Sequence, residues 1–351
     1  MLSVKSLIQF RCVSKTWREL IRSTKFIAMH LERDKDEIVL ICNLCLYLIF
    51  ASNIFRSSYF LEPTDSLSQV STNVRIPYFD ARTQLQILGL CNGLICFTNY
   101  YTIVLCDPVL QEFCLPPDCP FPCPHGFRPI VFGMGSGFDP CTNDYKVFRM
   151  LEVVNDDEDE YWNDDGPKYE IYNLSTDSWR EIDARVPRIP VDPWFELFFN
   201  GASSRRPYAS RIILCFIISR EVFTIIDFSE SCSDTSEDDG KDSSLVVLNE
   251  CLAMVRYQAW MTEPHLIDIW AMKEYGVKES WIKQFTVGPI LVMCSLSSWK
   301  SYTLLMEGSD GQLVSCELNT NIIKKFEIYS DRRDSLRVLI FKKSLVSTMN
   351  T

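Results

Sequence analysis

Histidine is scarce in this sequence of 351 residues, which contains only three, at positions 30, 125 and 265. Neither His125 nor His265 lies near a serine or cysteine in a nucleophile elbow, and His30 belongs to the helical pattern at the N-terminus. A triad assembled from distant segments stays open, but no motif asks for one. We therefore expect no catalytic residues and no cofactor.

Long apolar runs are also missing. Residues 38–51 are apolar, but this run has fourteen residues with Asn43 inside it and is too short to span a bilayer. We expect one or two buried strands there and no membrane partner. No basic and apolar leader precedes the first helical pattern, so we expect no secretory route. The fifteen cysteines are then expected to be reduced thiols, in the cytoplasm or also in the nucleus.

Basic residues are absent from residues 156–165, which contain seven acids, and residues 230–242 contain six acids and one lysine. These two segments carry −12, and the whole chain carries −11 at pH 7. Two solvated loops would give this pattern, and so would two negative patches that attract a basic partner. Nucleic acid is disfavoured, because phosphate has the same sign. The candidate target-binding residues are Asp156, Asp157, Glu158, Asp159, Glu237, Asp238 and Asp239.

Short apolar runs separated by turn residues dominate the chain from residue 88 onward, which predicts an all-β protein. Aromatic residues make up 13% of the chain, a content that suits many strands. Residues 52–84 are patterned weakly and are interpreted as a connection.

A hairpin pattern recurs five times along the chain. Each copy combines an apolar strand pattern, a turn, and a second strand opened by a large apolar residue. Recurring hairpins of this kind indicate the blades of a β-propeller, and we expect five to seven blades. The five copies begin at residues 103, 170, 213, 267 and 314.

Residues 2–31 have apolar positions at helical spacing. Ser14 is placed to cap the second helix, and Ser23 or Thr24 to cap a third. Helices this short need each other, and a partner, to bury their apolar stripes. The charged residues 32–37 mark a boundary. The stripes are Val4, Leu7 and Ile8, followed by Val13, Trp17, Leu20 and Ile21.

Residues 2–7 read Leu-Ser-Val-Lys-Ser-Leu, and residues 12–17 read Cys-Val-Ser-Lys-Thr-Trp. This stretch resembles the second half of a plant F-box, with Ser3 where the family usually has proline, and we expect an F-box truncated at its N-terminus. The resemblance implies docking onto a Skp-type adaptor and, through it, onto a cullin-based ubiquitin ligase. A helical cap that binds nothing, with Trp17 as a core residue, is the alternative. The expected adaptor-binding residues are Leu2, Val4, Leu7, Phe10, Val13, Lys15 and Trp17.

Motifs spread over the rest of the chain resemble the F-box-associated domain of plants, which is kelch-like and binds the target of the ligase. They lie at residues 89–95, 107–108, 137–147 and 172–180. A second set is closer to the S-locus F-box branch, which in pollen recognises basic ribonucleases of the pistil. It lies at residues 199–202, 270–281 and 334–337.

Two further patterns resemble ligand sites. The glycines of residues 133–137 are followed by a strand pattern rather than a helix, so close packing of strands is favoured over phosphate binding. Cys114, Cys119, Cys123 and His125 could hold zinc, but their spacing fits no standard finger. We expect no metal site.

The sequence therefore predicts a mainly β protein, with a kelch-like β-propeller in residues 37–351 after a short helical, partial F-box segment in residues 1–36. The predicted function is substrate recognition for a Skp–cullin–F-box ubiquitin ligase, with a target such as a basic ribonuclease. Two alternatives are a binding propeller decoupled from the ligase, and an enzyme built on a propeller.

Overall fold

The computed structural model describes two N-terminal helices, a set of β-strands and many of the turns between them. The described residues are 4–23, 25–26, 29–30, 37–43, 60–61, 67–68, 78–79, 86–99, 101–107, 110, 112–118, 125–155, 167–186, 195, 197–205, 211–229, 232, 242–258, 262–299, 302–330 and 336–342.

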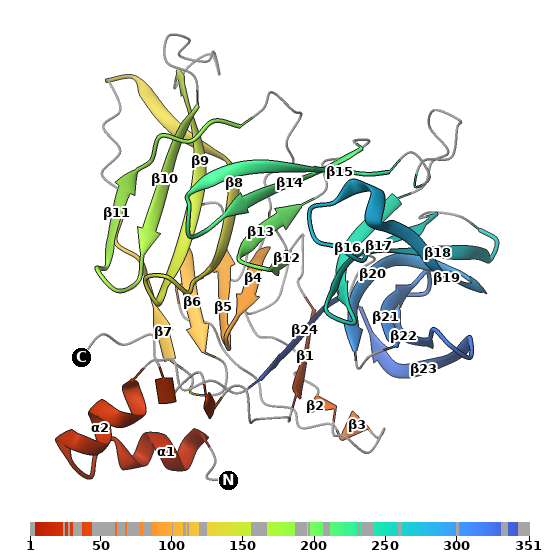
Figure 1. Cartoon of the computed structure of the whole chain (residues 1–351), viewed down its shortest axis with the longest axis horizontal. Helices are drawn as coiled ribbons and strands as arrows, with labels where there is room; N and C mark the ends of the chain where they lie inside the picture. The colour runs from red at the N-terminus through yellow and green to blue at the C-terminus, as the bar shows by residue number, and fades with distance from the viewer. Residues whose placement is uncertain are drawn as a thin grey trace.

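Five antiparallel sheets of four strands form the body of the protein, which is a mainly β, five-bladed β-propeller with short N-terminal helices (Figure 1). Within each blade, four consecutive strands pair in chain order. The first blade contains β4 (Gln86–Cys91), β5 (Leu94–Thr98), β6 (Ile103–Asp107) and β7 (Glu112–Cys114). The second contains β8 (Phe127–Asp139), β9 (Asp144–Asn155), β10 (Lys168–Asn173) and β11 (Ser178–Glu181).

The third blade contains β12 (Leu197–Phe199), β13 (Ala202–Arg205), β14 (Ile212–Ile217) and β15 (Val222–Asp227). The fourth contains β16 (Asp242–Leu248), β17 (Cys251–Tyr257), β18 (His265–Met272) and β19 (Trp281–Ile290). A 3-10 helix, η2 (Lys278–Ser280), precedes β19. The fifth contains β20 (Val292–Trp299), β21 (Thr303–Gly308), β22 (Gln312–Glu317) and β23 (Ile322–Tyr329).

All five predicted hairpins are confirmed as the third and fourth strands of a blade. They are β6–β7, β10–β11, β14–β15, β18–β19 and β22–β23, and each pair is antiparallel. The repeat detected in the sequence is therefore the outer half of each blade.

A two-stranded sheet pairs a strand before the first blade with a strand after the fifth. β1 (Glu37–Asn43) pairs with β24 (Leu336–Lys342), so that Glu37 lies opposite Lys342. β24 contacts β20 of the fifth blade and β4 of the first blade, which places this sheet between them. The short hairpin of β2 (Phe60–Leu61) and β3 (Leu67–Ser68) adjoins β1. The strand expected within residues 38–51 is confirmed up to Asn43, and the rest of that run lies outside the described residues.

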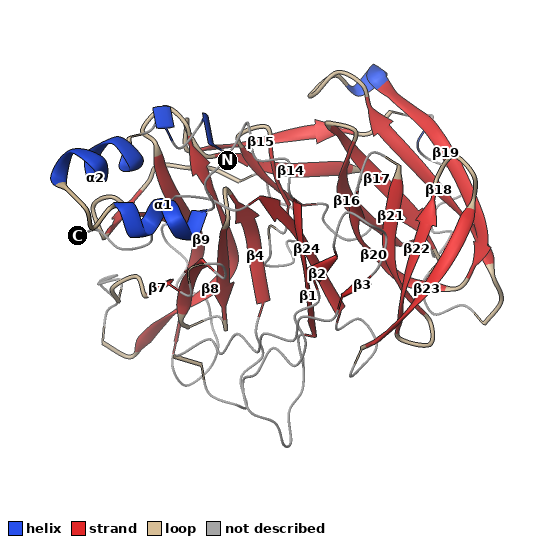
Figure 2. Ribbon diagram, turned by 90° about the horizontal axis from the view of Figure 1, so that it is seen from below, coloured by secondary structure: helices blue, strands red, loops and turns tan. Residues whose placement is uncertain are grey.

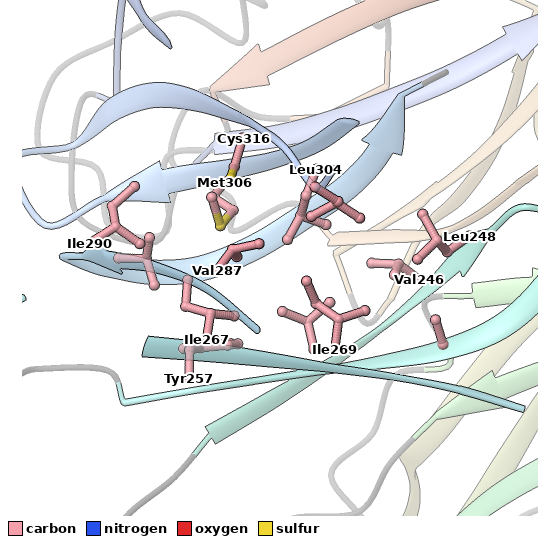
Figure 3. Close-up of a cluster of buried hydrophobic side chains, with 14 of the residues drawn as sticks. Val246, Leu248, Tyr257, Ile267, Ile269, Val287, Ile290, Leu304, Met306 and Cys316 are labelled. Atoms are coloured by element: carbon pink, nitrogen blue, oxygen red, sulfur yellow. The ribbon is translucent and has the colours of Figure 1, made fainter. Parts of the chain in front are cut away.

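Apolar side chains fill the spaces between neighbouring blades. Between the fourth and fifth blades, buried residues such as Ile267, Ile269, Leu304 and Met306 pack together (Figure 3). Comparable clusters join the first, second, third and fourth blades in turn, and another joins the fifth blade to β24. Each fully buried side chain of this size stabilises the fold by roughly 1.5–3 kcal/mol, so burial between blades holds the ring together.

The glycines of residues 133–137 lie in β8, as the packing interpretation predicted. A Cβ on Gly135 would lie 2.6 Å from the ring of Phe148 and 2.8 Å from the Cβ of Phe195. A methyl group has no space there, because real Cβ atoms do not approach other atoms so closely. The glycine lets the aromatic side chains of the second and third blades cover β8.

Two helices, α1 (Val4–Phe10) and α2 (Lys15–Arg22), precede the propeller. They lie beside the first and second blades and away from the fourth and fifth (Figure 2). Among the helices that the structure describes, none combines the length and the apolar character needed to cross a membrane.

Candidate functional site

Side-chain caps define the ends of the N-terminal helices. The Oγ of Ser14 accepts a hydrogen bond from the backbone N of Trp17 at 3.2 Å, which confirms Ser14 as the N-cap of α2. The Oγ of Ser23 accepts one from the backbone N of Phe26 at 3.3 Å, as expected for the cap of a third helical segment. The Nε of Arg18 donates to the backbone O of Arg11 at 3.3 Å, which ties α2 to the end of α1.

One side of the two helices faces inward. Leu7 of α1 and Ile21 of α2 are buried, and Ile21 has no exposed surface. Leu110, from the β6–β7 connection of the first blade, packs against this pair. Leu7 and Ile21 therefore attach the helices to the propeller.

The other side of the helices presents apolar side chains to solvent. Val13 is 66% exposed, Trp17 is 45% exposed and Leu20 is 52% exposed. The rings of Phe10 and Trp17 lie 5.5 Å apart, centroid to centroid, so Phe10 supports the exposed indole from one side. Three large exposed apolar side chains within eight residues indicate a protein-binding surface. We call Val13, Trp17 and Leu20 the outer face.

The residues predicted to bind an adaptor are divided between these two sides. Val13 and Trp17 lie on the outer face, Lys15 is exposed at the start of α2, and Phe10 is partly buried beside Trp17. Leu7 packs inward instead. Val4 begins α1, and Leu2 lies outside the described residues.

The connections from the first strand to the second and from the third strand to the fourth lie at one end of each blade, and most of them are tight turns. Asn92, Asn143 and Asn200 adopt positive φ in these turns, a conformation that asparagine tolerates better than most residues. The Oη of Tyr145 donates to the backbone O of Cys91 at 2.8 Å, which places the turns of the first two blades at the same end. Leu110 lies in such a turn, so α1 and α2 adjoin this end of the first blade.

The other ends of the strands lie at the opposite end of each blade, because neighbouring strands in a blade are antiparallel. β9 ends there at Asn155, and β15 ends there at Asp227. The predicted target-binding acids follow these two strands in the chain. All seven of them, Asp156, Asp157, Glu158, Asp159, Glu237, Asp238 and Asp239, lie outside the described residues. The strand ends that flank them face away from the helices.

Four charged groups form a cluster between the second and third blades. The Nζ of Lys146 lies 2.9 Å from Asp139 Oδ2 and 2.9 Å from Glu221 Oε1, and Lys146 is 3% exposed. The guanidinium of Arg180 also contacts Glu221. Thr142 Oγ1 donates to Asp139 at 2.8 Å.

The ion pairs within this cluster shift its pKa values more than burial does, so that all of its groups stay charged. Burial alone would raise the pKa of Asp139 and Glu221, but hydrogen bonds from Lys146 to both, and from Arg180 to Glu221, hold both pKa values below the ordinary range. Burial would lower the pKa of Lys146, and the two carboxylates raise it instead. Every charge has a partner, so we interpret this cluster as a structural link and not as a reaction site.

The cysteine and histidine side chains that could take part in catalysis or metal binding have structural roles instead. Burial raises the pKa of the Cys91 and Cys96 thiols to about 12, which leaves them protonated and poorly nucleophilic. The Nε2 of His265 accepts a hydrogen bond from the backbone N of Gln258 at 2.9 Å. Within the described part of the chain, no three His, Cys, Asp or Glu side chains gather as metal ligands do. Cys119 and Cys123 of the predicted cysteine cluster lie outside it.

Comparison with known proteins covers both parts of the chain. A family model described as the F-box associated beta propeller domain matches residues 45–347, and one described as the F-box domain matches residues 1–28. The F-box protein CPR1 of Arabidopsis thaliana is 28% identical over 96% of this chain and 81% of its own length. An F-box/kelch-repeat protein of the same plant is 25% identical over 82% of this chain and 76% of its own length.

Proposed function

Because this chain belongs to the plant F-box proteins that carry an F-box associated β-propeller domain, we propose that it is the substrate-recognition subunit of a Skp–cullin–F-box ubiquitin ligase. An F-box implies binding to Skp1 and, through it, to a cullin, and F-box adaptor proteins are not catalysts. The protein acts by holding the lysines of a target close to a ubiquitin-conjugating enzyme, which raises their effective concentration.

The observation that carries this proposal is the exposure of the outer face. Trp17 and Leu20 are exposed on α2, and Val13 is exposed in the turn before it, whereas Ile21 on the other side of α2 packs in the cluster that includes Leu110 of the propeller. Leaving this apolar surface in water is unfavourable, and a partner that covers it recovers the free energy of burial. We assign the adaptor contacts to this face, with Phe10 supporting Trp17 and Lys15 at its edge.

Isothermal titration calorimetry of the whole chain with a plant Skp-type adaptor tests the proposal. We expect a dissociation constant of about 1 μM or lower, equivalent to roughly 8 kcal/mol. A folded protein that releases no heat at adaptor concentrations of about 100 μM would instead support the decoupled propeller.

We further propose that the target is a basic protein, such as a ribonuclease of the kind recognised by the S-locus branch. The support is the charge of residues 156–165 and 230–242, which carry thirteen acids and one base. The strand ends that flank these segments lie at the end of the propeller away from α1 and α2, and we place the target at that end. A protein with this role acts in the cytoplasm and the nucleus, where we propose that it resides.

Replacing the acids of residues 156–159 and 237–239 by the corresponding amides tests the charge proposal. We expect the association rate with a basic pistil ribonuclease to fall by about tenfold at low salt, because long-range attraction steers the encounter. The salt dependence of the rate should flatten, as measured by stopped-flow fluorescence.

Glu274 and Glu279 offer a matched control, because both are exposed at the end that carries the tight turns. Their replacement by glutamine should leave the association rate nearly unchanged. Equal rates for the native chain and the amide variant would exclude steering by the two acidic segments.

A further inference from the structure

Leu110 packs, from the propeller, against the small apolar cluster that Leu7 of α1 and Ile21 of α2 form. Its side chain packs against the buried pair of Leu7 and Ile21, together with the partly buried Phe26. An eight-residue helix cannot cover one of its own side chains completely, yet Ile21 has no exposed surface. Its cover therefore comes from outside α2, and the propeller supplies part of it through Leu110.

Asp107 fixes the backbone at Leu110. The Oδ1 of Asp107 accepts a hydrogen bond from the backbone N of Leu110 at 2.9 Å, the arrangement by which an aspartate stabilises a turn after itself. Asp107 is itself buried at the end of β6, a strand whose five residues are all buried. Leu110 is therefore held by a rigid part of the first blade.

The contact with Leu110 does not compete with adaptor binding. Leu7 and Ile21 point toward Leu110, whereas Val13, Trp17 and Leu20 are exposed on the outer face. The helices can thus stay attached to the first blade while an adaptor covers their other side. The attachment adjoins the end of the propeller that carries the tight turns, away from the strand ends at Asn155 and Asp227.

We infer that Leu110 is a positioning residue, which docks the adaptor-binding helices onto the first blade and thereby sets the orientation of the propeller in the ligase. The packing of Leu110 against Leu7 and Ile21 is the evidence for the docking. Its consequence for ubiquitin transfer rests on the proposed function. A fixed orientation limits which lysines come within reach of the conjugating enzyme, because effective concentration depends on geometry. Loosened helices let the propeller rotate and bring other lysines into reach.

Replacing Leu110 by aspartate in the whole chain tests this inference. A carboxylate against Leu7 and Ile21 costs desolvation free energy, so we expect the helices to separate from the blade. Amides of α1 and α2 should exchange with deuterium at least about tenfold faster, with strand amides unchanged. The dissociation constant for a plant Skp-type adaptor should stay within about twofold, because the outer face is untouched. In the assembled ligase, mass spectrometry should find ubiquitin on more of the receptor's own lysines.

Two further variants separate the loss of the Leu110 contact from the effect of adding a charge. Leu110→Ala removes the contact without adding charge and should raise helix exchange in the same direction, with a thermal transition of the propeller close to that of the native chain. Leu266→Asp makes the same chemical change at an exposed leucine of the fourth blade and should alter neither helix exchange nor the ubiquitin pattern.

Unchanged helix exchange in both Leu110 variants would overturn the docking. Faster helix exchange with an unchanged set of modified lysines would overturn the positioning role. A native chain that fails to bind the adaptor would refute the proposed function, and the exchange experiment would still decide whether Leu110 docks the helices.

Discussion

Replacing Lys146 by methionine is expected to lower the free energy of unfolding by about 3–5 kcal/mol, the usual result of removing one partner from a buried charge pair. Lys146 is buried with its Nζ 2.9 Å from both Asp139 and Glu221. Without the ammonium group, the fully buried Asp139 loses its cation, and Arg180 alone faces Glu221. Chemical denaturation at pH 7 measures the loss, which is a large part of the stability of an ordinary domain.

The lowered pKa values of Asp139 and Glu221 determine how the loss of stability in Lys146→Met changes with pH. Asp139 and Glu221 have pKa values lowered in the folded state, so their pairing stabilises the fold above their ordinary values of 3.8 and 4.5 and is lost as the pH falls through the lowered ones. In Lys146→Met, burial acts without the opposing cation, and both carboxyls should protonate at higher pH than in the native chain. The difference in stability between the two proteins should therefore be greatest near pH 7 and should narrow below about pH 4.

Lys325→Met is a matched control for the same change of side chain. Lys325 lies 3.0 Å from Asp310, but both side chains are at least half exposed. An exposed pair of this kind contributes about 1 kcal/mol or less. Losses of similar size in the two variants would show that the cluster around Lys146 is no stronger than a surface ion pair.

Replacing Trp17 by alanine is expected to weaken adaptor binding by at least about 30-fold, equivalent to roughly 2 kcal/mol, as exposed tryptophans at the centre of interfaces commonly do. The indole is the largest side chain of the outer face and rests against Phe10. The N-cap of α2 should survive, because Ser14 receives its hydrogen bond from the backbone of residue 17. The thermal transition of the propeller should stay nearly unchanged, since its cores lie elsewhere. Calorimetry of the variant beside the native chain measures the effect.

Tyr101 provides a control for loss of an exposed aromatic ring. It is 89% exposed in the β5–β6 turn, where Asn99 Oδ1 accepts hydrogen bonds from the backbone N of both Tyr101 and Thr102. Tyr101→Ala should leave adaptor affinity unchanged. A loss below about threefold for Trp17→Ala would remove the indole from the interface and place the main adaptor contacts on other residues.

Sequence patterns predicted those parts of the fold that depend on interactions between residues close together in the chain. Ser14 was identified as a cap from its place before a helical stripe, and the cap is present. The outer hairpins were found because a strand, a connection and a second strand follow one another directly in the sequence, with only a four-residue turn between the strands in four of the five blades. The inner strands show no such signal. β12 has only three residues, and the apolar pattern of β8 contains glycines. The structure explains Gly135, because a larger residue there would clash with Phe148 and Phe195.

Contacts between distant segments could not be predicted in the same way. Nothing in the sequence around Leu110 relates it to Leu7 or Ile21, and Asp107 at most suggests a stable turn. The link from Lys146 to Glu221 also joins residues of neighbouring blades that lie 75 positions apart in the chain. Trp17 had two interpretations, as a core residue or as an interface residue, and its exposure favours the second. The strands resembled a propeller because its local unit repeats, whereas the contacts that attach the helices occur once.

The pairing of β1 with β24 also constrains the order of events during synthesis. Glu37 leaves the ribosome near the beginning and must wait for Lys342 before its backbone hydrogen bonds can form. Joining segments this distant costs chain entropy that no local contact offsets, so ring closure is the late and slow step of folding. The residues of α1 and α2 are synthesised long before the ring can close. The residues of the outer face are therefore synthesised before the chain has the closed propeller on which we propose that a target is held.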